Sequence, residues 1–280
     1  MGVRPRILIC YLEPEKFTGE NYKRQMAYLR ELELFFQETI YLEETNAGEL
    51  FGNRNVGESI CITTSPDLAA QMQGLGISVV GFEADKQELM KAPYIVLGLD
   101  EISYEDLVRI FRRWHKLPWD ILETERLKVR ELSLDDLDGL RALYDKPHIT
   151  DFVEPLYAPE QERQYQQNYI DKIYGFYGFG MWLVLEKETG RLVGRAGFEY
   201  RDYCREGEVE MGYLIDPDRW RRGYATEVCE ALLTYARDEL NVRCVLCRVS
   251  PENVASRGLL DKLGFTIREK GEEWIFSYDL

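Results

Sequence analysis

The feature of the sequence that most constrains the fold is a strand that runs into an arginine-rich turn at the start of a helix. We expect the strand over 208–215 and the helix over 225–240, and the turn between them reads DPDRWRRGYATE over 216–227. The first turn of a helix carries free main-chain N–H groups and the positive end of the helix dipole. This arrangement predicts that a phosphate binds where the helix begins.

Individual residues of the turn fit such a ligand. Gly223 lets an anion approach the main chain closely, and Ala225 leaves the first helical turn uncrowded. Arg221 and Arg222 add positive charge, although the chain as a whole has a formal net charge of −15. The arginine pair is therefore a local feature of a very acidic protein.

The composition excludes several classes of partner and of site. With 50 acidic residues against 35 basic ones, the protein repels nucleic acid and anionic membranes and favours cationic partners. No apolar run is long enough for a membrane span and no signal peptide is evident, so we expect a cytoplasmic protein. The six cysteines show no disulfide framework, which fits a reducing compartment, and Cys244 and Cys247 would face opposite sides of a strand. With only two histidines, no metal site and no histidine triad are predicted.

The first part of the chain, 1–117, alternates apolar strand patterns with helical ones. Such an order predicts a small parallel α/β domain. Residues 118–122, where Pro118 stops a helix, are expected to form a short linker to a second domain over 123–280. The strands are expected over 6–12, 58–65, 77–82 and 93–98, and the helices over 21–39, 66–75 and 103–114, with Ser65 and Ser103 as caps.

About residues 6–117 resemble the haloacid-dehalogenase-like hydrolases. The resemblance rests on ICITTS (60–65), LGISVVG (75–81) and YIVLGLDE (94–101). That family needs an Asp-x-Asp after its first strand, and here the position reads Cys10-Tyr-Leu-Glu13. Because phosphatase chemistry has no first step without the nucleophile, the resemblance implies a degenerate domain. It would serve as a silent scaffold, as the dimerisation surface of a homodimer, or as a module that recruits substrate.

The second part of the chain has the order strand, two helices, three strands, helix, strand, helix and final strands. This order predicts an α+β domain with a mixed sheet that is mainly antiparallel at its start. A Glu-Thr-Gly turn over 188–190 is typical of a hairpin. The strands are expected over 127–132, 181–190, 191–200, 208–215, 243–249, 265–269 and 273–278, and the helices over 134–144, 159–173, 225–240 and 253–263.

Four stretches of this second part resemble the GNAT superfamily of acyl-CoA-dependent N-acyltransferases. The nearest branch is that of the ribosomal-protein N-terminal acetyltransferases and their relatives that modify small molecules. The resemblance implies a GNAT fold over 123–280 and N-acetyltransferase activity. The stretches read TERLKVREL (124–132), EMGYLIDP (210–217), WRRGYATE (220–227) and NVASRGLLDKLGF (253–265).

The resemblance also implies acetyl-CoA as the co-substrate that brings the phosphate. The pantetheine arm would enter where the strands 208–215 and 243–249 splay apart, and it would pair with the main chain of Leu214 and Ile215. Asn253 and Ser256 would lie near the thioester, with Asn253 acting both as helix cap and as cofactor contact. The pyrophosphate would be held by the main-chain N–H groups of Arg221, Arg222, Gly223, Tyr224, Ala225 and Thr226, assisted by the Thr226 hydroxyl.

The chemistry of such an enzyme is direct attack of a neutral amine on the thioester, which requires a base. Glu210 is the candidate base, because it lies on the strand beside the thioester and partial burial would raise its pKa. A purely structural role for Glu210 is an equal alternative. Glu208 or Glu199 are further candidates, acting through a water molecule.

The acid side of the reaction is less clearly marked. Many of these enzymes place a tyrosine where this chain has Leu260, so Ser256 is the predicted substitute that protonates or hydrogen-bonds the thiolate. The alternative is that the thiolate leaves without a side-chain acid. A main-chain N–H within 211–213 is expected to stabilise the oxyanion.

The leading hypothesis is an acetyl-CoA-dependent N-acetyltransferase that acts on a primary amine. The acceptor would be a cationic small molecule, such as an aminoglycoside or a polyamine, or a protein N-terminus. The alternatives are an acyl-CoA-binding regulatory or scaffold protein with little turnover, and a residual phosphatase. A group of aromatic residues suits a cation, although such residues at helical spacing more often form core: Tyr165, Tyr169, Tyr174, Phe176, Tyr177, Phe179 and Trp182.

Overall fold

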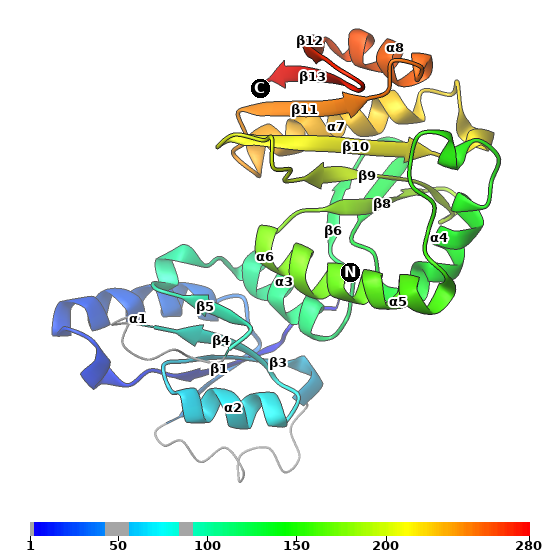
Figure 1. Cartoon of the computed structure of the whole chain (residues 1–280). Helices are drawn as coiled ribbons and strands as arrows, with labels where there is room; N and C mark the ends of the chain where they lie inside the picture. Colours follow the sequence, from blue (N-terminus) through cyan, green and yellow to red (C-terminus); the bar gives the residue numbers. More distant parts are fainter. Residues whose placement is uncertain (1–2, 43–55, 84–91) are drawn as a thin grey trace. The chain divides into compact units, whose positions relative to one another are not determined.

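The computed structural model describes residues 3–42, 56–83 and 92–280, and the chain divides into two compact units, Met1–Leu117 and Pro118–Leu280 (Figure 1). Strand β6 (Asp120–Glu123) begins inside the segment expected to be a linker. That expectation is wrong for residues 120–122, because Ile121 and Leu122 pack against the core of the second unit. Among the described residues, no helix combines the length and the apolar character that a membrane span requires.

The first unit is built on a five-stranded parallel sheet with the order β2-β1-β3-β4-β5, which confirms the predicted parallel α/β class. β3 and β4 are buried along their whole length, since apolar clusters cover both faces of the sheet. The strands are β1 (Ile7–Tyr11), β2 (Glu38–Tyr41), β3 (Ser59–Thr63), β4 (Ser78–Phe82) and β5 (Tyr94–Val96); the helices are α1 (Gly19–Glu33), α2 (Pro66–Gly74) and α3 (Tyr104–Trp114).

Two helix starts of this unit are as predicted, and one helix end is not. The Ser65 hydroxyl accepts a hydrogen bond from the first turn of α2, and Ser103 forms a capping box with Asp106 at the start of α3. The helix expected over 21–39 instead ends at Glu33, and the edge strand β2 follows it. β2 contains no fully buried residue, so it lacks the apolar run that identifies the other strands.

The strand order of the first unit is the flavodoxin-like one of doubly wound sheets. Where β1 ends, the Glu13 carboxylate pairs with Lys16 Nζ (2.9 Å) and accepts a hydrogen bond from Thr64 Oγ1 (3.1 Å). Lys16 Nζ also donates to the Thr64 carbonyl (3.0 Å), so side chains of the unit itself bridge the carboxyl ends of β1 and β3. The haloacid-dehalogenase-like resemblance stays a prediction.

The second unit is built on an eight-stranded sheet with the order β12-β13-β11-β10-β9-β8-β7-β6. Only β10 and β11 run parallel within it, and every other neighbouring pair is antiparallel, which confirms the predicted mixed sheet. The strands after β6 are β7 (Leu127–Arg130), β8 (Met181–Glu186), β9 (Leu192–Glu199), β10 (Glu208–Ile215), β11 (Cys244–Val249), β12 (Thr266–Lys270) and β13 (Trp274–Asp279).

Helices cover both faces of this sheet (Figure 1). Trp182 and Val184 of β8 pack in the core cluster that contains the apolar face of α7, whereas Leu183 between them packs against α4. The helix expected over 159–173 continues as a π-helical segment, Tyr169–Tyr174, which widens the helix beside the sheet. The helices are α4 (Leu137–Tyr144), α5 (Pro159–Asn168), α6 (Gly175–Tyr177), α7 (Tyr224–Asp238) and α8 (Val254–Leu263).

Candidate active site

The centre of the second sheet opens where β10 and β11 diverge. The two strands pair in parallel as far as Glu210 and Leu246, and both then continue without pairing to each other. Beyond this point β10 stays paired to β9, and β11 stays paired to β13. The predicted splay is confirmed, and it leaves one edge of β10 open from Met211 onward.

The turn after β10 leads into α7 through two residues with left-handed main-chain conformations, Arg221 (φ 59°) and Gly223 (φ 81°). Such alternation turns successive N–H groups toward one side and forms an anion-binding concavity. From Arg221 to Thr226, no main-chain N–H makes a hydrogen bond of normal geometry to a described residue. The first helical hydrogen bond runs from Glu227 N to the Gly223 carbonyl (3.0 Å).

The side chains of this turn divide into exposed and anchored groups. Arg221 and Arg222 are exposed, and their guanidinium groups form no ion pair with a described residue. The Thr226 hydroxyl likewise has no hydrogen-bond partner among the described residues. The Tyr224 side chain is different, because it is buried and serves the structure of the turn while its main-chain N–H stays available.

Glu186 at the end of β8 stabilises the turn through side-chain hydrogen bonds. Its carboxylate accepts hydrogen bonds from Arg219 Nε and Nη2 (both 3.0 Å) and from the Tyr224 hydroxyl (2.6 Å). Hydrogen bonds from Arg219, Tyr224 and Thr189 lower the pKa of Glu186 to about 2. The carboxylate is therefore charged at any physiological pH, and it ties both ends of the turn to the sheet.

Two basic residues from distant parts of the chain complete this support. Lys146 Nζ contacts both carboxylate oxygens of Asp216 (2.7 Å each) and one of Asp218 (2.6 Å). Arg126 donates to Glu227 of α7 through Nε (2.6 Å) and to the Arg222 carbonyl through Nη1 (2.9 Å). The row of free N–H groups thus lies on a turn that is fixed by charged contacts.

The main chain of β10 corrects the expectation for the pantetheine arm. A Cβ atom at Gly194 would meet the Leu214 carbonyl oxygen, so the peptide groups of Leu214 point toward β9. Because strand peptide groups alternate, those of Tyr213 and Ile215 point to the open edge. The Ile215 carbonyl accepts a hydrogen bond from Trp220 Nε1 (2.7 Å). Tyr213, rather than Leu214, therefore offers its main-chain groups to a ligand at this edge.

The start of α8 lies across the opening from β10. Asn253 is the N-cap of this helix and accepts a hydrogen bond from Ser256 N through Oδ1 (3.0 Å). The Ser256 hydroxyl lies 2.6 Å from the hydroxyl of Tyr213, a residue that the sequence analysis did not single out as a side chain. Leu260, at the position for which the family resemblance implied a tyrosine, is fully buried in the core. The Tyr213 phenol consequently lies beside Ser256 in the first turn of α8, one helical turn before the position of Leu260.

Glu210 lies on the face of β10 opposite to Met211 and Tyr213. Its side chain is 13% exposed, and Oε2 is buried with no hydrogen-bond partner. Burial raises the pKa of Glu210, the neighbouring Arg201 and Arg248 lower it, and Glu199 and Glu273 raise it further, with a net upward shift. A carboxylate with a raised pKa and a free buried oxygen has the properties of a general base.

The two other carboxylates proposed as bases differ in their surroundings. Glu208 accepts hydrogen bonds from Arg268 Nη1 (2.9 Å) and from Arg205 N (3.0 Å), which gives it a structural role. Glu199 is the cross-strand neighbour of Glu210 on β9, so the two carboxylates share one face of the sheet. The guanidinium of Arg201 contacts both Glu199 and Glu210.

A pocket of about 360 Å³ lies beside this pair of carboxylates. Of the aromatic residues selected from the sequence, Tyr174 and Trp182 belong to the core, and Phe176 is exposed but does not line this pocket. The others do line it. Its lining residues are Tyr165, Asn168, Tyr169, Lys172, Ile173, Tyr177, Phe179, Phe198, Glu199, Tyr200 and Arg201.

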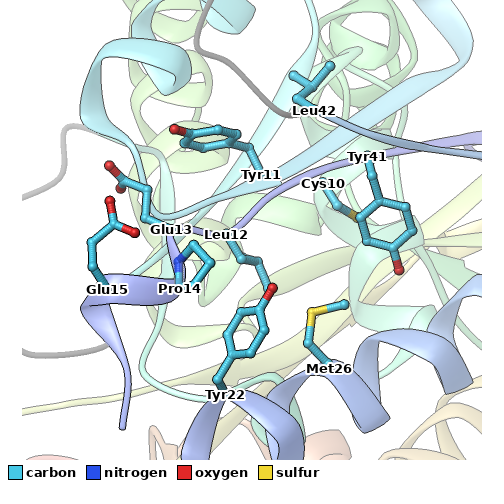
Figure 2. Close-up of a pocket in the computed structure, with 10 residues that line it drawn as sticks. All are labelled: Cys10, Tyr11, Leu12, Glu13, Pro14, Glu15, Tyr22, Met26, Tyr41 and Leu42. Carbon is cyan, nitrogen blue, oxygen red and sulfur yellow. The ribbon is translucent and has the colours of Figure 1, made fainter. Parts of the chain in front are cut away.

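The first unit has a hollow of its own at the carboxyl ends of β1 and β2, with a volume of about 460 Å³ (Figure 2). Figure 2 shows Tyr22 and Met26 of α1 facing this space from one side, and Glu13 and Glu15 at its acidic end. Cys10 also lines it, but burial raises the pKa of the thiol well above its ordinary value, so this cysteine is not a reactive thiolate.

Comparisons with known proteins agree on the second unit. The family model of the acetyltransferase (GNAT) domain matches residues 126–266, which is half of the chain. The uncharacterized N-acetyltransferase p20 of Bacillus licheniformis is 31% identical over 149 residues, which cover 52% of this chain and 82% of that protein. The uncharacterized N-acetyltransferase YjdG of Bacillus subtilis is 27% identical over 164 residues, covering 56% of this chain and 97% of that protein.

Among solved structures, the ribosomal-protein-S5-alanine acetyltransferase of Vibrio fischeri superposes with a TM-score of 0.50. The sequence identity is 15%, and the match covers 56% of this chain and 95% of that one, so this likeness shows the fold alone. The second unit therefore has the fold of that acetyltransferase. The chain belongs to the GNAT acetyltransferase family.

Proposed function

We propose that this acetyltransferase transfers an acetyl group from acetyl-CoA to a primary amine by direct attack. The observation that carries the proposal is the arrangement along β10. Its open edge begins directly after Glu210, the candidate base, and leads to the free N–H groups at the start of α7. One extended ligand with an anionic end and a reactive end fits these features together.

In this proposal the pyrophosphate of CoA is bound by the main-chain N–H groups from Arg221 to Thr226, with the exposed guanidinium groups of Arg221 and Arg222 beside it. The pantetheine arm lies along the open edge of β10, where it meets the main chain of Tyr213. The thioester then lies between Glu210 and the start of α8. No metal takes part in this scheme, and the described residues contain no group of acidic, histidine or cysteine side chains suited to hold one.

The two faces of β10 supply the two halves of the chemistry. The amine nitrogen attacks the thioester carbon, a C–N bond forms and the C–S bond breaks, which yields the amide and CoA. On one face, Glu210 takes the proton that the attacking nitrogen loses. On the other face, the Ser256 hydroxyl, in contact with the Tyr213 hydroxyl, donates a hydrogen bond to the departing sulfur. In this proposal a main-chain N–H within 211–213, at the open edge, stabilises the oxyanion.

The remaining parts of the proposal concern the setting of the reaction. A cationic acceptor, either a small molecule or a protein N-terminus, fits the net charge of −15. The six cysteines are buried free thiols, which supports the expected cytoplasmic location. We assign the transferase to the second unit, Pro118–Leu280, which includes β6. We retain 1–117 as a non-catalytic domain, with a homodimer as a prediction.

The replacement Glu210→Gln tests the proposal, because it keeps the size of the side chain and removes its basicity. We expect kcat for acetylation to fall about a hundredfold or more, the usual contribution of a general base, while the Kd of CoA measured by calorimetry stays unchanged. Release of free CoA thiol, followed with a chromogenic disulfide, measures the turnover.

Glu208→Gln is the matched control, because it removes a carboxylate from the same strand and face that is held by Arg268. It should retain most of the activity. If the wild-type protein binds CoA but acetylates no amine in a broad panel, the alternative of an acyl-CoA-binding scaffold protein is favoured over the enzyme. Acetylation that is undiminished in Glu210→Gln would remove Glu210 from the mechanism.

A further inference from the structure

We infer that the acceptor is a primary amine with a single positive charge and an aromatic or apolar body, and that its ammonium group displaces Arg201 from Glu199 and Glu210. This inference rests on the proposed function, and it narrows the acceptor to one chemical class. It is carried by the lining of the pocket beside the two carboxylates and by the charges around its rim.

The walls of the pocket are aromatic and come from two sides. The π-helical segment and α6 contribute Tyr169 and Tyr177, and β9 and the residue after it contribute Phe198 and Tyr200. The rings of Tyr177 and Tyr200 are nearly parallel, with an interplanar angle of 18° and centroids 6.5 Å apart. Both rings are about half exposed, so they offer their faces to a flat or apolar group.

The charges on the pocket favour one ammonium group and disfavour a second. Glu199 is the carboxylate of the lining, and it is joined by Glu210 on the neighbouring strand. Lys172 and Arg201 are the cations of the lining. Lys172 is exposed and forms no ion pair with a described residue, so it repels the distal charge of a diamine or polyamine.

Arg201 lies where the ammonium group of the substrate is needed. Its guanidinium contacts Glu199 directly and lies 3.7 Å from Glu210 Oε1, measured from Nε. The Arg201 side chain is 44% exposed, whereas that of Glu210 is 13% exposed, so the guanidinium caps the carboxylates from the solvent side. Because the guanidinium is the exposed partner, another cation that compensates the same carboxylates can take its place.

The site therefore selects among amines by exchanging the Arg201 guanidinium for the ammonium group of the substrate. An ammonium group that enters the pocket compensates the two carboxylates as Arg201 does, and the released guanidinium then remains near the rim beside Lys172. A substrate with a second charge meets both cations, whereas an aromatic body packs against the exposed surfaces of the tyrosine rings. Arg201 is therefore a specificity-determining residue of the acceptor site.

The test compares 2-phenylethylamine with 1,4-diaminobutane, using the full chain saturated with acetyl-CoA for turnover and with CoA for binding. We expect the wild-type protein to favour 2-phenylethylamine by about tenfold in kcat/KM and in Kd, as follows from one unfavourable charge contact at the rim. Arg201→Gln and Lys172→Gln should each reduce this preference severalfold. Arg205→Gln removes an exposed arginine from the same loop that does not line the pocket, and it should leave the preference unchanged.

A preference of the wild-type protein for the diamine overturns the inference, and so does an Arg201→Gln variant with the wild-type ratio. The binding measurement separates this failure from failure of the proposed function. If 2-phenylethylamine binds the CoA complex more tightly than the diamine and neither is acetylated, the acceptor class stands and the enzymatic proposal fails. If both are acetylated with the opposite preference, the enzyme stands and the acceptor class is wrong.

Discussion

Replacing Glu186 by glutamine tests whether the turn over 216–227 is held in position by a residue that does not itself contact the ligand. Glu186 accepts two hydrogen bonds from Arg219 and one from Tyr224, which lie at the two ends of the turn. The glutamine keeps one acceptor oxygen and loses the charge. Hydrogen bonds to a charged group contribute about 1.5–3 kcal/mol each and neutral ones about 0.5–1.5 kcal/mol, so the variant should lose about 2 kcal/mol of unfolding free energy.

This loss corresponds to a melting temperature lower by about 4–8 °C for a unit of this size. We also expect the Kd of CoA to rise about tenfold, because ordering the turn on binding takes about 1.4 kcal/mol. Calorimetry measures both quantities. Glu188→Gln is the control, since Glu188 is an exposed residue of the same hairpin and forms no ion pair with a described residue.

The stability difference should also depend on pH in a defined direction. The pKa of Glu186 is about 2 in the folded protein, against 4.5 for an ordinary glutamate. A carboxylate with a lowered pKa stabilises the folded state above the ordinary value and stops doing so as the pH falls from about 4.5 toward 2. The gap between wild type and variant should be constant near neutrality and shrink in that window. Unchanged CoA affinity and unchanged melting temperature in Glu186→Gln would refute the reasoning.

Two further predictions concern the two faces of β10. Tyr213→Phe and Ser256→Ala should each lower kcat by about threefold to tenfold, while the Kd of CoA stays unchanged. Because the two hydroxyls act as one hydrogen-bonded unit, the double variant should have the same kcat as the single variants. Additive losses of kcat in this double-mutant cycle contradict the prediction. The acid limb of the kcat/KM profile should lie above pH 4.5, the ordinary value for a glutamate, because the pKa of Glu210 is raised. Arg201→Gln should move this limb further upward, because Arg201 lowers the pKa of Glu210; a downward movement contradicts this assignment.

The features that the sequence predicts well are those set by neighbouring residues. The caps Ser65 and Ser103 depend on local main-chain geometry, and the structure confirms them. The splay of β10 from β11 was expected from the family resemblance, and the short parallel ladder bears it out. The edge strand β2 was missed, because an edge strand with no buried residue carries no apolar signal.

The support of the site was not predicted, because it joins residues that are far apart in the chain. Lys146 contacts Asp216, and Arg126 contacts Glu227, across 70 and 101 positions respectively. No spacing rule connects such pairs before the sheet order is known. Arg126 lies in TERLKVREL (124–132), one of the stretches that carry the family resemblance. Its place in that stretch was the one sign in the sequence that it has a role near the site.

The assignment of Leu214 shows a different limit. Sequence alternation tells which side chains share a face of a strand, but it does not tell which neighbour receives each peptide group. That depends on the register with β9, in which Leu214 lies opposite Arg195. Arg201 illustrates the opposite case, because a cation two residues after Glu199 was visible in the sequence and only its contact with Glu210 needed the structure.

The parallel ladder between β10 and β11 spans the three residues from Glu208 to Glu210. This ladder joins β12, β13 and β11 to the five strands from β10 to β6. A ligand that lies in the gap beyond Glu210 would form hydrogen bonds to β10 and pack against β11. Its extended part would then continue the contact between the two parts of the sheet. In the proposed complex, CoA therefore connects the two parts of the sheet, and the release of CoA after the reaction removes this connection.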